Sequence, residues 1–405
     1  MKLKFPRFFL FIITIFFDKL GTMNQCTQIP KTLKEIKITL PDYKNSNCNL
    51  SNSILKNFGI KPLNDTLSLI DPYLEKDYKN VVLLLLDGMG KTIVENHLKE
   101  EGAFRTHLAG IYKSVFLPTT VAATTSIRSG LMPIEHSWFG WECYYPSIDK
   151  NVVVFTNKIQ GIDTQAAPYN VAQTVNPYES IIDKINKTEN EAYEVASYYD
   201  KEVTSIEKLC EKVKTICSKP LKNNNAKRFI YAYFEDPDHA LHLNGCKSER
   251  VTNILTNIEK VVENLTKELN DTLFIITADH GHIDTDIVML QDYPKIMNTL
   301  VRLPSLEPRA LNLFVKEGLE EIFEEEFNKE FGDKFLLLTM QEVLEKGLFG
   351  TKPPHKNAKG MLGNYMAIAT SNLTIITINF VDEFFVSMHG GLTEDEMLIP
   401  LIIFD

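Results

Sequence analysis

The segment EDPDHALH (235–242) places a dense group of acidic side chains and two histidines directly behind the apolar run FIYAYF. Asp238 and His242 are four residues apart, so on a helical turn they share one face and can grip one cation. His239 is expected to point elsewhere. Carboxylates at the end of a buried strand are costly unless a positive charge neutralises them. The segment therefore predicts a metal site.

Three further segments carry metal-binding residue types. Asp87 ends an apolar run in VVLLLLDGMG, Asp279 and His280 are adjacent in TADHG, and His389 stands in SMHGG. Read singly, each of these fits a polar residue at a strand end or turn equally well. Together with the aspartate and histidine of the first segment, they supply ligands of the types that two zinc-like ions use, if one more oxygen ligand is found.

The missing oxygen has candidates in FLPTTVAATTSIRSGLMPIEHSW (116–138). A threonine hydroxyl held by a metal at the start of a helix becomes a nucleophile, because the ion lowers its pKa. The same pattern also fits a threonine-rich helix N-cap. Residue type and spacing do not separate Thr119 from Thr120.

The elements that must position these residues follow from the apolar runs. Continuous apolar stretches in 81–90, 228–238 and 271–281 predict buried parallel strands, and EMLIPLIIFD repeats the pattern in weaker form at the end of the chain. Helical patterns lie between them, which predicts an α/β fold with a mostly parallel central sheet and helices on both faces. Ligands collect at the carboxyl ends of strands in such sheets, where these aspartates fall.

The chain has 405 residues, a net charge of −10 and six cysteines without CxxC spacing. This acidic balance without a basic cluster argues against a nucleic-acid partner. Scattered cysteines favour a cytoplasmic location. The alternative is a secreted or membrane-anchored protein, because the apolar block at 8–17 suits a signal-peptide core although it is too short to span a bilayer. If Met23 is the true start, residues 1–22 are an artefact. Oligomeric state leaves no signal.

Taken in order, LLLDGMG, PTT…SGLMPIEHS, EDPDHALH, TADHG and HGG resemble the alkaline phosphatase superfamily. They are most similar to its nucleotide pyrophosphatase/phosphodiesterase (type I phosphodiesterase) branch, including bacterial members. The resemblance covers about 81–405 and implies an alkaline phosphatase-like catalytic domain. We expect that domain at 77–405, with insertions at about 140–225 and 285–385, after an N-terminal extension at 1–76. The implied activity is hydrolysis of phosphodiester or pyrophosphate bonds in a small phosphate ester such as a nucleotide.

The resemblance also implies two divalent metal ions, with zinc expected first and manganese as the alternative. Relatives place the nucleophile ten residues before the glycine of a T-G-L-x-P-like element, and counting back from Gly130 gives Thr120, which would also bind metal. The implied ligands are Asp238, His242 and His389 for one ion, and Asp87, Thr120, Asp279 and His280 for the other.

One position departs from the family pattern. Phosphodiesterase relatives carry an asparagine three residues after the nucleophile, where this chain has Ala123. Thr124, Lys91 or a backbone N–H near Thr120 are candidates to replace its contact with the phosphoryl oxygen. The preference for diesters over monoesters therefore stays open. The alternatives are a metal-dependent phosphomonoesterase or phosphomutase of the same superfamily, or a degenerate metal-binding protein without activity.

Overall fold

The computed structural model describes residues 37–377 and 385–405. The apolar block at 8–17 lies outside these ranges, so cytoplasmic location and the membrane-anchored alternative both stay predictions. Within the two described ranges, none of the helices combines the length and apolarity needed to cross a bilayer.

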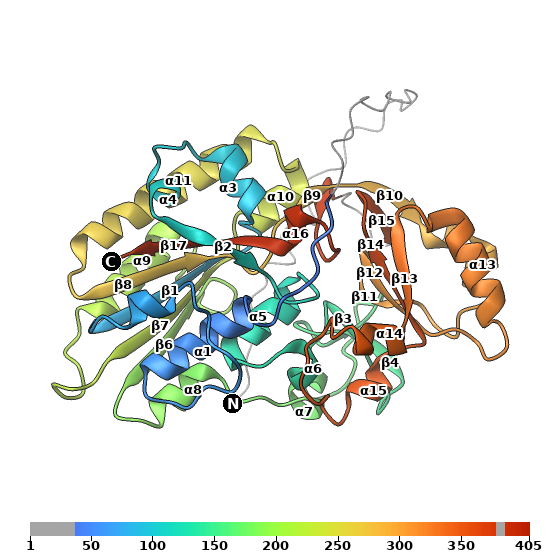
Figure 1. Ribbon diagram of the computed structural model, residues 1–405, viewed down its shortest axis with the longest axis horizontal. Helices are drawn as coiled ribbons and strands as arrows, with labels where there is room; N and C mark the ends of the chain where they lie inside the picture. Colours follow the sequence, from blue (N-terminus) through green and yellow to red (C-terminus); the bar gives the residue numbers. More distant parts are fainter. Residues whose placement is uncertain (1–36, 378–384) are drawn as a thin grey trace.

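A six-stranded sheet forms the larger half of the molecule (Figure 1). Its central strand β1 (Asn80–Leu86) is buried along its whole length and pairs in parallel with β7 and with β8. Continuous apolar runs are what a strand covered on both faces requires. The predicted α/β fold with a mostly parallel sheet is confirmed. The strand order is β2 (Leu108–Lys113), β17 (Leu398–Phe404), β8 (Thr272–Thr277), β1, β7 (Arg228–Phe234) and β6 (Glu191–Ala196).

The C-terminal strand β17 differs from the expectation of another parallel strand. It runs antiparallel to both β8 and β2. The chain enters β17 directly from the short helix α16 (Glu394–Met397), without the long crossover that a parallel connection needs. Because α16 lies at the carboxyl edge of the sheet, the strand must run back from that edge.

Helices cover both faces of this sheet (Figure 1). The long helix α11 buries apolar residues at spacings of three and four, which gives it one apolar stripe toward the sheet. The helices on its face are α3 (Lys91–His97), α4 (Ala103–Thr106), α9 (Ile206–Cys217), α10 (Asp238–Asn244) and α11 (Glu249–Glu268). The opposite face carries α1 (Asn47–Asn57), α5 (Thr120–Ser129) and α8 (Ile181–Asn186).

A second, seven-stranded antiparallel sheet forms the smaller half. Helix α13 (Glu320–Phe331) packs against it through Phe323, Phe327 and Phe331. Helices α14 (Met340–Glu345) and α15 (Ala358–Met361) contact the same sheet and belong to a separate apolar cluster. Its strand order is β13 (Phe335–Thr339), β14 (Tyr365–Ala369), β12 (Ala310–Leu313), β11 (Ser305–Glu307), β3 (Glu142–Tyr145), β4 (Lys150–Val153) and β5 (Lys158–Ile159).

These sheets divide the chain differently from the expected insertions. Strands from 142–159 and from 305–369 share the second sheet, whereas β6 and α9 belong to the first sheet although they fall inside the expected 140–225 insertion. Helix α1, within the expected extension, packs against α5. Pairing between strands so far apart in the chain depends on their combined packing and leaves no local signal.

Two short sheets complete the junction between the halves. The first pairs β9 (Ile283–Asp284) antiparallel with β16 (Ser387–Met388), and the second pairs β10 (Asp286–Met289) in parallel with β15 (Leu373–Ile376). The β9–β16 pair matters most for the site, because it brings the segment after β8 beside the segment that carries His389.

Candidate metal centre

The ends of β1, β7 and β8 lie at one edge of the large sheet. Leu86 is opposite Phe234, and the residue before it is opposite Thr277, so the acids that follow each strand converge. The turn after β1 also touches the turn after β7, since Asp238 N donates to Asp87 O at 3.0 Å. Gly88 adopts a left-handed φ of 72°, and a Cβ there would meet the Cα of Asp238 at 3.0 Å. Glycine therefore permits this close approach.

One group of side chains surrounds Asp238. Helix α10 starts at Asp238, and His242 follows one turn later with its Nε2 atom 3.5 Å from Asp238 Oδ1. His389 arrives from the segment after β16 and places its Nε2 atom 3.9 Å from the same oxygen. The exposed His239 lies apart. The structure thus brings the three residues of this expected ligand set together.

The second group is more deeply buried. His280 Nε2 lies 3.3 Å from Asp87 Oδ1 and 3.6 Å from Asp279 Oδ2. The hydroxyl of Thr120, the first residue of α5, lies 3.2 Å from the same nitrogen and 3.5 Å from Asp87 Oδ2. Thr119 points elsewhere and donates to Glu307 Oε1 at 2.5 Å. Tertiary structure therefore separates two threonines that residue type and spacing left equivalent.

The three histidines of these groups are all held in the same tautomer. Their Nδ1 atoms lie on backbone carbonyls: His242 on Ser387 O at 2.8 Å, His280 on Gly281 O at 3.1 Å and His389 on Pro118 O at 3.1 Å. Because a carbonyl can only accept, each Nδ1 carries a proton, and each ring turns its Nε2 atom toward the carboxylates. Metal-ligating histidines are oriented in this way.

Two carboxylate oxygens in the centre have no donor. Among the residues that the structure describes, Asp87 Oδ1 and Asp279 Oδ2 are buried without a hydrogen bond. Burial raises the pKa of Asp87 well above its usual range, and the neighbouring charge of Asp238 raises it further. Burial and the charge of Asp87 likewise raise the pKa of Asp279. Unpaired carboxylate oxygens beside histidine Nε2 atoms fit divalent cations, which bind both kinds of ligand.

Asp238 differs from these two carboxylates. Burial acts to raise its pKa, but His242, His282 and His389 outweigh that effect and hold the pKa well below its usual range. Its side chain also keeps 19% exposure, whereas those of Asp87 and Asp279 have 3% and 0%. The Asp238 group therefore faces the outside of the centre.

Three residues of the centre escaped sequence reasoning. His282 lies 2.6 Å from Asp238 Oδ1, and its place two residues after His280 was an available signal. The Tyr233 hydroxyl donates to Asp87 Oδ2, but a tyrosine inside a buried strand carries no such signal. Glu307 arrives from the second sheet, and burial raises its pKa to about 7.

The side chains considered as replacements for the missing asparagine are engaged elsewhere. Ala123 is fully buried among apolar residues. The Thr124 hydroxyl donates to Thr120 O at 2.6 Å, and Lys91 pairs with Glu95 at 3.8 Å. The remaining candidates are the first N–H groups of α5, which have no partner within their own helix.

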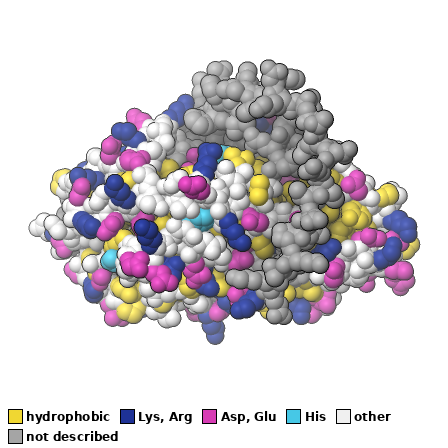
Figure 2. All heavy atoms as spheres, turned by 90° about the horizontal axis from the view of Figure 1, so that it is seen from above, with side chains coloured by type: hydrophobic (Ala, Val, Ile, Leu, Met, Phe, Trp, Pro, Cys, Tyr) yellow, Lys and Arg dark blue, Asp and Glu magenta, His cyan; other side chains and the backbone are white. Residues whose placement is uncertain are grey.

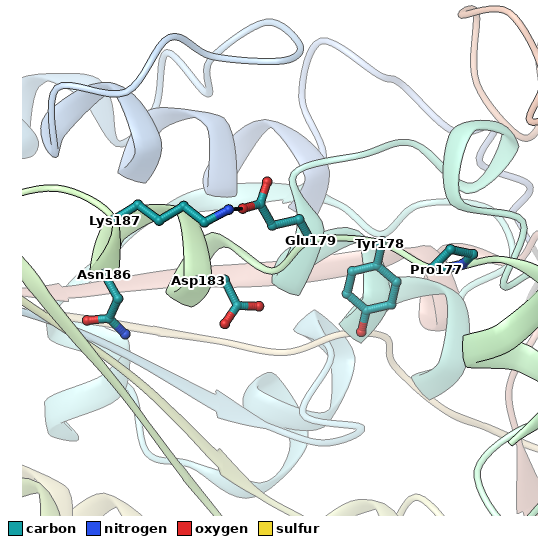
Figure 3. A pocket seen from close by; sticks show the side chains of 6 residues that line it. All are labelled: Pro177, Tyr178, Glu179, Asp183, Asn186 and Lys187. Carbon is teal, nitrogen blue, oxygen red and sulfur yellow. Dashed lines mark hydrogen bonds and ion pairs between the residues drawn. The ribbon is translucent and has the colours of Figure 1, made fainter. Parts of the chain in front are cut away.

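A surface pocket on and beside α8 does not belong to this centre (Figure 3). Lys187 pairs there with Glu179, and Asp183 accepts from the Ser180 hydroxyl at 2.7 Å. These charged groups serve one another and the helix cap. On the described part of the face shown in Figure 2, Lys and Arg are mixed with Asp and Glu, and no stripe of positive charge for a nucleic-acid backbone is seen there.

Comparison with solved structures identifies the fold. Murine ectonucleotide pyrophosphatase/phosphodiesterase 5, in an inactive form in complex with AMP, superimposes with a TM-score of 0.59 at 16% identity, covering 80% of this chain and 87% of that one. The human protein of the same name gives a TM-score of 0.58 at 16% identity, with 80% and 87% covered. At this identity the likeness shows the fold. No curated protein matches the sequence.

The family model described as type I phosphodiesterase / nucleotide pyrophosphatase matches residues 81–317, more than half of the chain. The resemblance drawn from the sequence motifs is therefore confirmed, and a degenerate binding protein without activity is set aside. This chain belongs to the type I phosphodiesterase / nucleotide pyrophosphatase family of the alkaline phosphatase superfamily and is a phosphoric ester hydrolase.

Proposed function

We propose that this hydrolase cleaves phosphodiester or pyrophosphate bonds in small nucleotide-like esters, with Thr120 as its nucleophile and two divalent cations as cofactors. The observation that carries the proposal is the place of the Thr120 hydroxyl, beside His280 Nε2 and Asp87 Oδ2 at the first residue of α5. Thr120 is partly exposed, so a substrate can reach it. The AMP held by the murine relative supports a nucleotide as substrate.

The ligand sets follow from the two groups of side chains. When bound, two divalent cations would neutralise the carboxylates, act as Lewis acids toward the phosphoryl group and lower the pKa of the nucleophilic hydroxyl. Zinc is the first candidate and manganese the second, because Asp and His suit both. The proposed ligands are Asp87, Thr120, Asp279 and His280 at the inner site, and Asp238, His242 and His389 at the outer site.

The chain's own residues orient the attack. The Thr120 hydroxyl points its proton toward Asp87 Oδ2, which also accepts from the Tyr233 hydroxyl. Thr120 Oγ1 attacks phosphorus in line with the leaving oxygen, giving a phosphothreonine and the first product. Water then cleaves the phosphothreonine and restores the hydroxyl.

The first turn of α5 is placed to hold the phosphoryl oxygens. Its unpartnered N–H groups and the positive end of the helix dipole attract anions. The Thr119 hydroxyl anchors this turn to Glu307 of the second sheet. These N–H groups would bind the phosphoryl oxygen in place of the asparagine that family relatives carry at the position of Ala123. Alanine at position 123, where phosphodiesterase relatives have asparagine, is also the observation that favours a second candidate function, that of a phosphomonoesterase.

The test is hydrolysis of bis-p-nitrophenyl phosphate beside p-nitrophenyl phosphate, with added zinc or manganese. We expect preferential cleavage of the diester, lowered by about 10³-fold or more in Thr120→Ala, as for loss of a covalent nucleophile in other enzymes. Thr119→Ala is the matched control and should lose less, because its hydroxyl serves only the turn. Wild-type turnover in Thr120→Ala with intact metal content would refute the nucleophile, and monoester preference would favour the phosphomonoesterase.

A further inference from the structure

His282 lies in the outer group, although neither the family resemblance nor the expected ligand sets include it. The residue follows β8, immediately before β9, and its side chain is buried. Its Nε2 atom is 2.6 Å from Asp238 Oδ1, closer than the nitrogen of His242 or of His389. Three imidazole nitrogens thus converge on one carboxylate oxygen.

The hydrogen bonds of His282 fix its tautomer. Its Nδ1 atom lies 3.1 Å from Ser387 Oγ. That hydroxyl has a single proton, which it donates to Leu241 O at 2.8 Å. The hydroxyl can therefore only accept from Nδ1, which leaves Nε2 as the ring atom that faces Asp238 Oδ1. A proton on Nε2 joins these two atoms when no metal is bound, and a divalent cation that displaces this proton would be held by both of them.

Ser387 holds two of the imidazoles at once. Its backbone carbonyl accepts from His242 Nδ1 at 2.8 Å, while its hydroxyl accepts from His282 Nδ1. The pairing of β16 with β9 places this serine between the two rings. His282 is therefore oriented in the same way as His242, and the Nε2 atoms of both rings face the same oxygen.

We propose that His282 Nε2 is a fourth protein ligand of the cation assigned to Asp238, His242 and His389, an inference that rests on the proposed function. Catalytic zinc sites usually combine three protein ligands with one open tetrahedral position. A fourth protein ligand would occupy that position, so His282 would change how the outer cation accepts a substrate oxygen.

The experiment compares the wild-type protein with His282→Gln, and with His97→Gln as a matched control. His97 is a buried histidine bonded to Thr252 Oγ1 and Cys246 O, outside both ligand groups. The two dissociation constants for Co²⁺ are measured by competition with a chelator, and the visible spectrum of bound Co²⁺ reports its coordination. We expect His282→Gln to weaken one of the two sites by at least about 10-fold and to alter its spectrum, and His97→Gln to change neither.

Ser387→Ala tests the same inference if His282→Gln does not fold, because it keeps the imidazole and removes only its anchor. It should weaken the same site and shift the spectrum by a smaller amount. Unchanged affinity and spectrum in either folded variant would overturn the assignment of His282. A wild-type protein that binds no Co²⁺ and cleaves no diester would instead refute the proposed function, so the two failures are distinguishable.

Discussion

Two of the regions that bury carboxylates in this molecule neutralise them in opposite ways. Glu396 and Arg309 are both fully buried and form a two-pronged ion pair with N···O distances of 2.7 and 2.8 Å. Burial acts to raise the pKa of Glu396, but Arg309 outweighs it and holds the pKa below its usual value. In the candidate metal centre, the ion-pairing partners of Asp87, Asp238 and Asp279 among the described residues are histidines alone.

The difference separates a structural carboxylate from a functional one. Both carboxylate oxygens of Glu396 accept hydrogen bonds from protein groups. Gly391 N and the Thr393 hydroxyl each donate at 2.7 Å, in addition to the guanidinium of Arg309. Asp279 Oδ2 has no such donor. A buried carboxylate oxygen without a hydrogen-bond donor in the protein indicates a site for a bound metal cation.

The two regions are also coupled. Glu396 belongs to α16 and Arg309 to the turn between β11 and β12, so this ion pair joins the two halves of the molecule. Glu396 O accepts from Gly281 N at 2.8 Å, next to His280. The structural pair therefore helps to hold two segments that carry proposed metal ligands.

The largest expected effect is removal of the outside cation. Dialysis against a chelator should lower diester hydrolysis by about 10³-fold or more, because it removes the cations that we propose to neutralise the carboxylates and activate the nucleophile. Turnover is measured before and after zinc or manganese is restored. Full turnover in protein shown by elemental analysis to be metal-free would break the comparison.

The next effect concerns the internal pair. Glu396→Gln should lower the free energy of unfolding by about 3–5 kcal/mol, because it leaves the Arg309 charge buried and unpaired. Urea denaturation measures this. Since the folded pKa of Glu396 is depressed, its contribution is present above the ordinary value of 4.5 and is lost as pH falls through the folded pKa. A cost that stays constant down to low pH would contradict this account.

In the candidate metal centre without metal, replacing a carboxylate by an amide is expected to raise the free energy of unfolding instead of lowering it. Asp279→Asn keeps the acceptor that Gly88 N and His280 N use, at 3.1 and 3.0 Å, and places an amide donor where Oδ2 is orphaned. Without metal, this variant should be more stable than the wild type by about 1–3 kcal/mol. With metal, it should bind more weakly.

The pH dependence of that gain has a definite direction. The folded pKa of Asp279 is raised, so the wild-type contribution is present at low pH and is lost as pH rises through the folded pKa. The advantage of Asp279→Asn over metal-free wild type should therefore grow with pH. Urea denaturation at several pH values checks this, and a metal-free variant less stable than wild type throughout would contradict it.

The smallest effect on stability is expected for an ion pair whose charges are hydrated by solvent. Lys267 and Glu263 pair at 2.6 Å one turn apart on α11, with side chains 66% and 36% exposed. A double-mutant cycle with alanine at both positions should give a coupling of about 0.3–0.5 kcal/mol that vanishes in high salt. If the coupling energy of this exposed pair were as large as that of the buried Arg309–Glu396 pair, burial would not explain the strength of the buried pair.

Local patterns in the sequence determined much of this protein. Unbroken apolar runs predicted β1, β7 and β8 as buried parallel strands, and their ends predicted where the aspartates gather. The helical period predicted that the side chains of Asp238 and His242 lie on the same face of a helix. These features are local, because burial and side-chain periodicity act over a few residues.

Tertiary structure alone decided the rest. Glu307, from the second sheet, turns Thr119 away and leaves the Thr120 hydroxyl in the centre. Ser387 turns His282 toward Asp238. The reversed direction of β17 and the shared sheet of 142–159 with 305–369 likewise join distant segments. Such pairings depend on packing summed over the whole chain, so no short stretch of sequence encodes them.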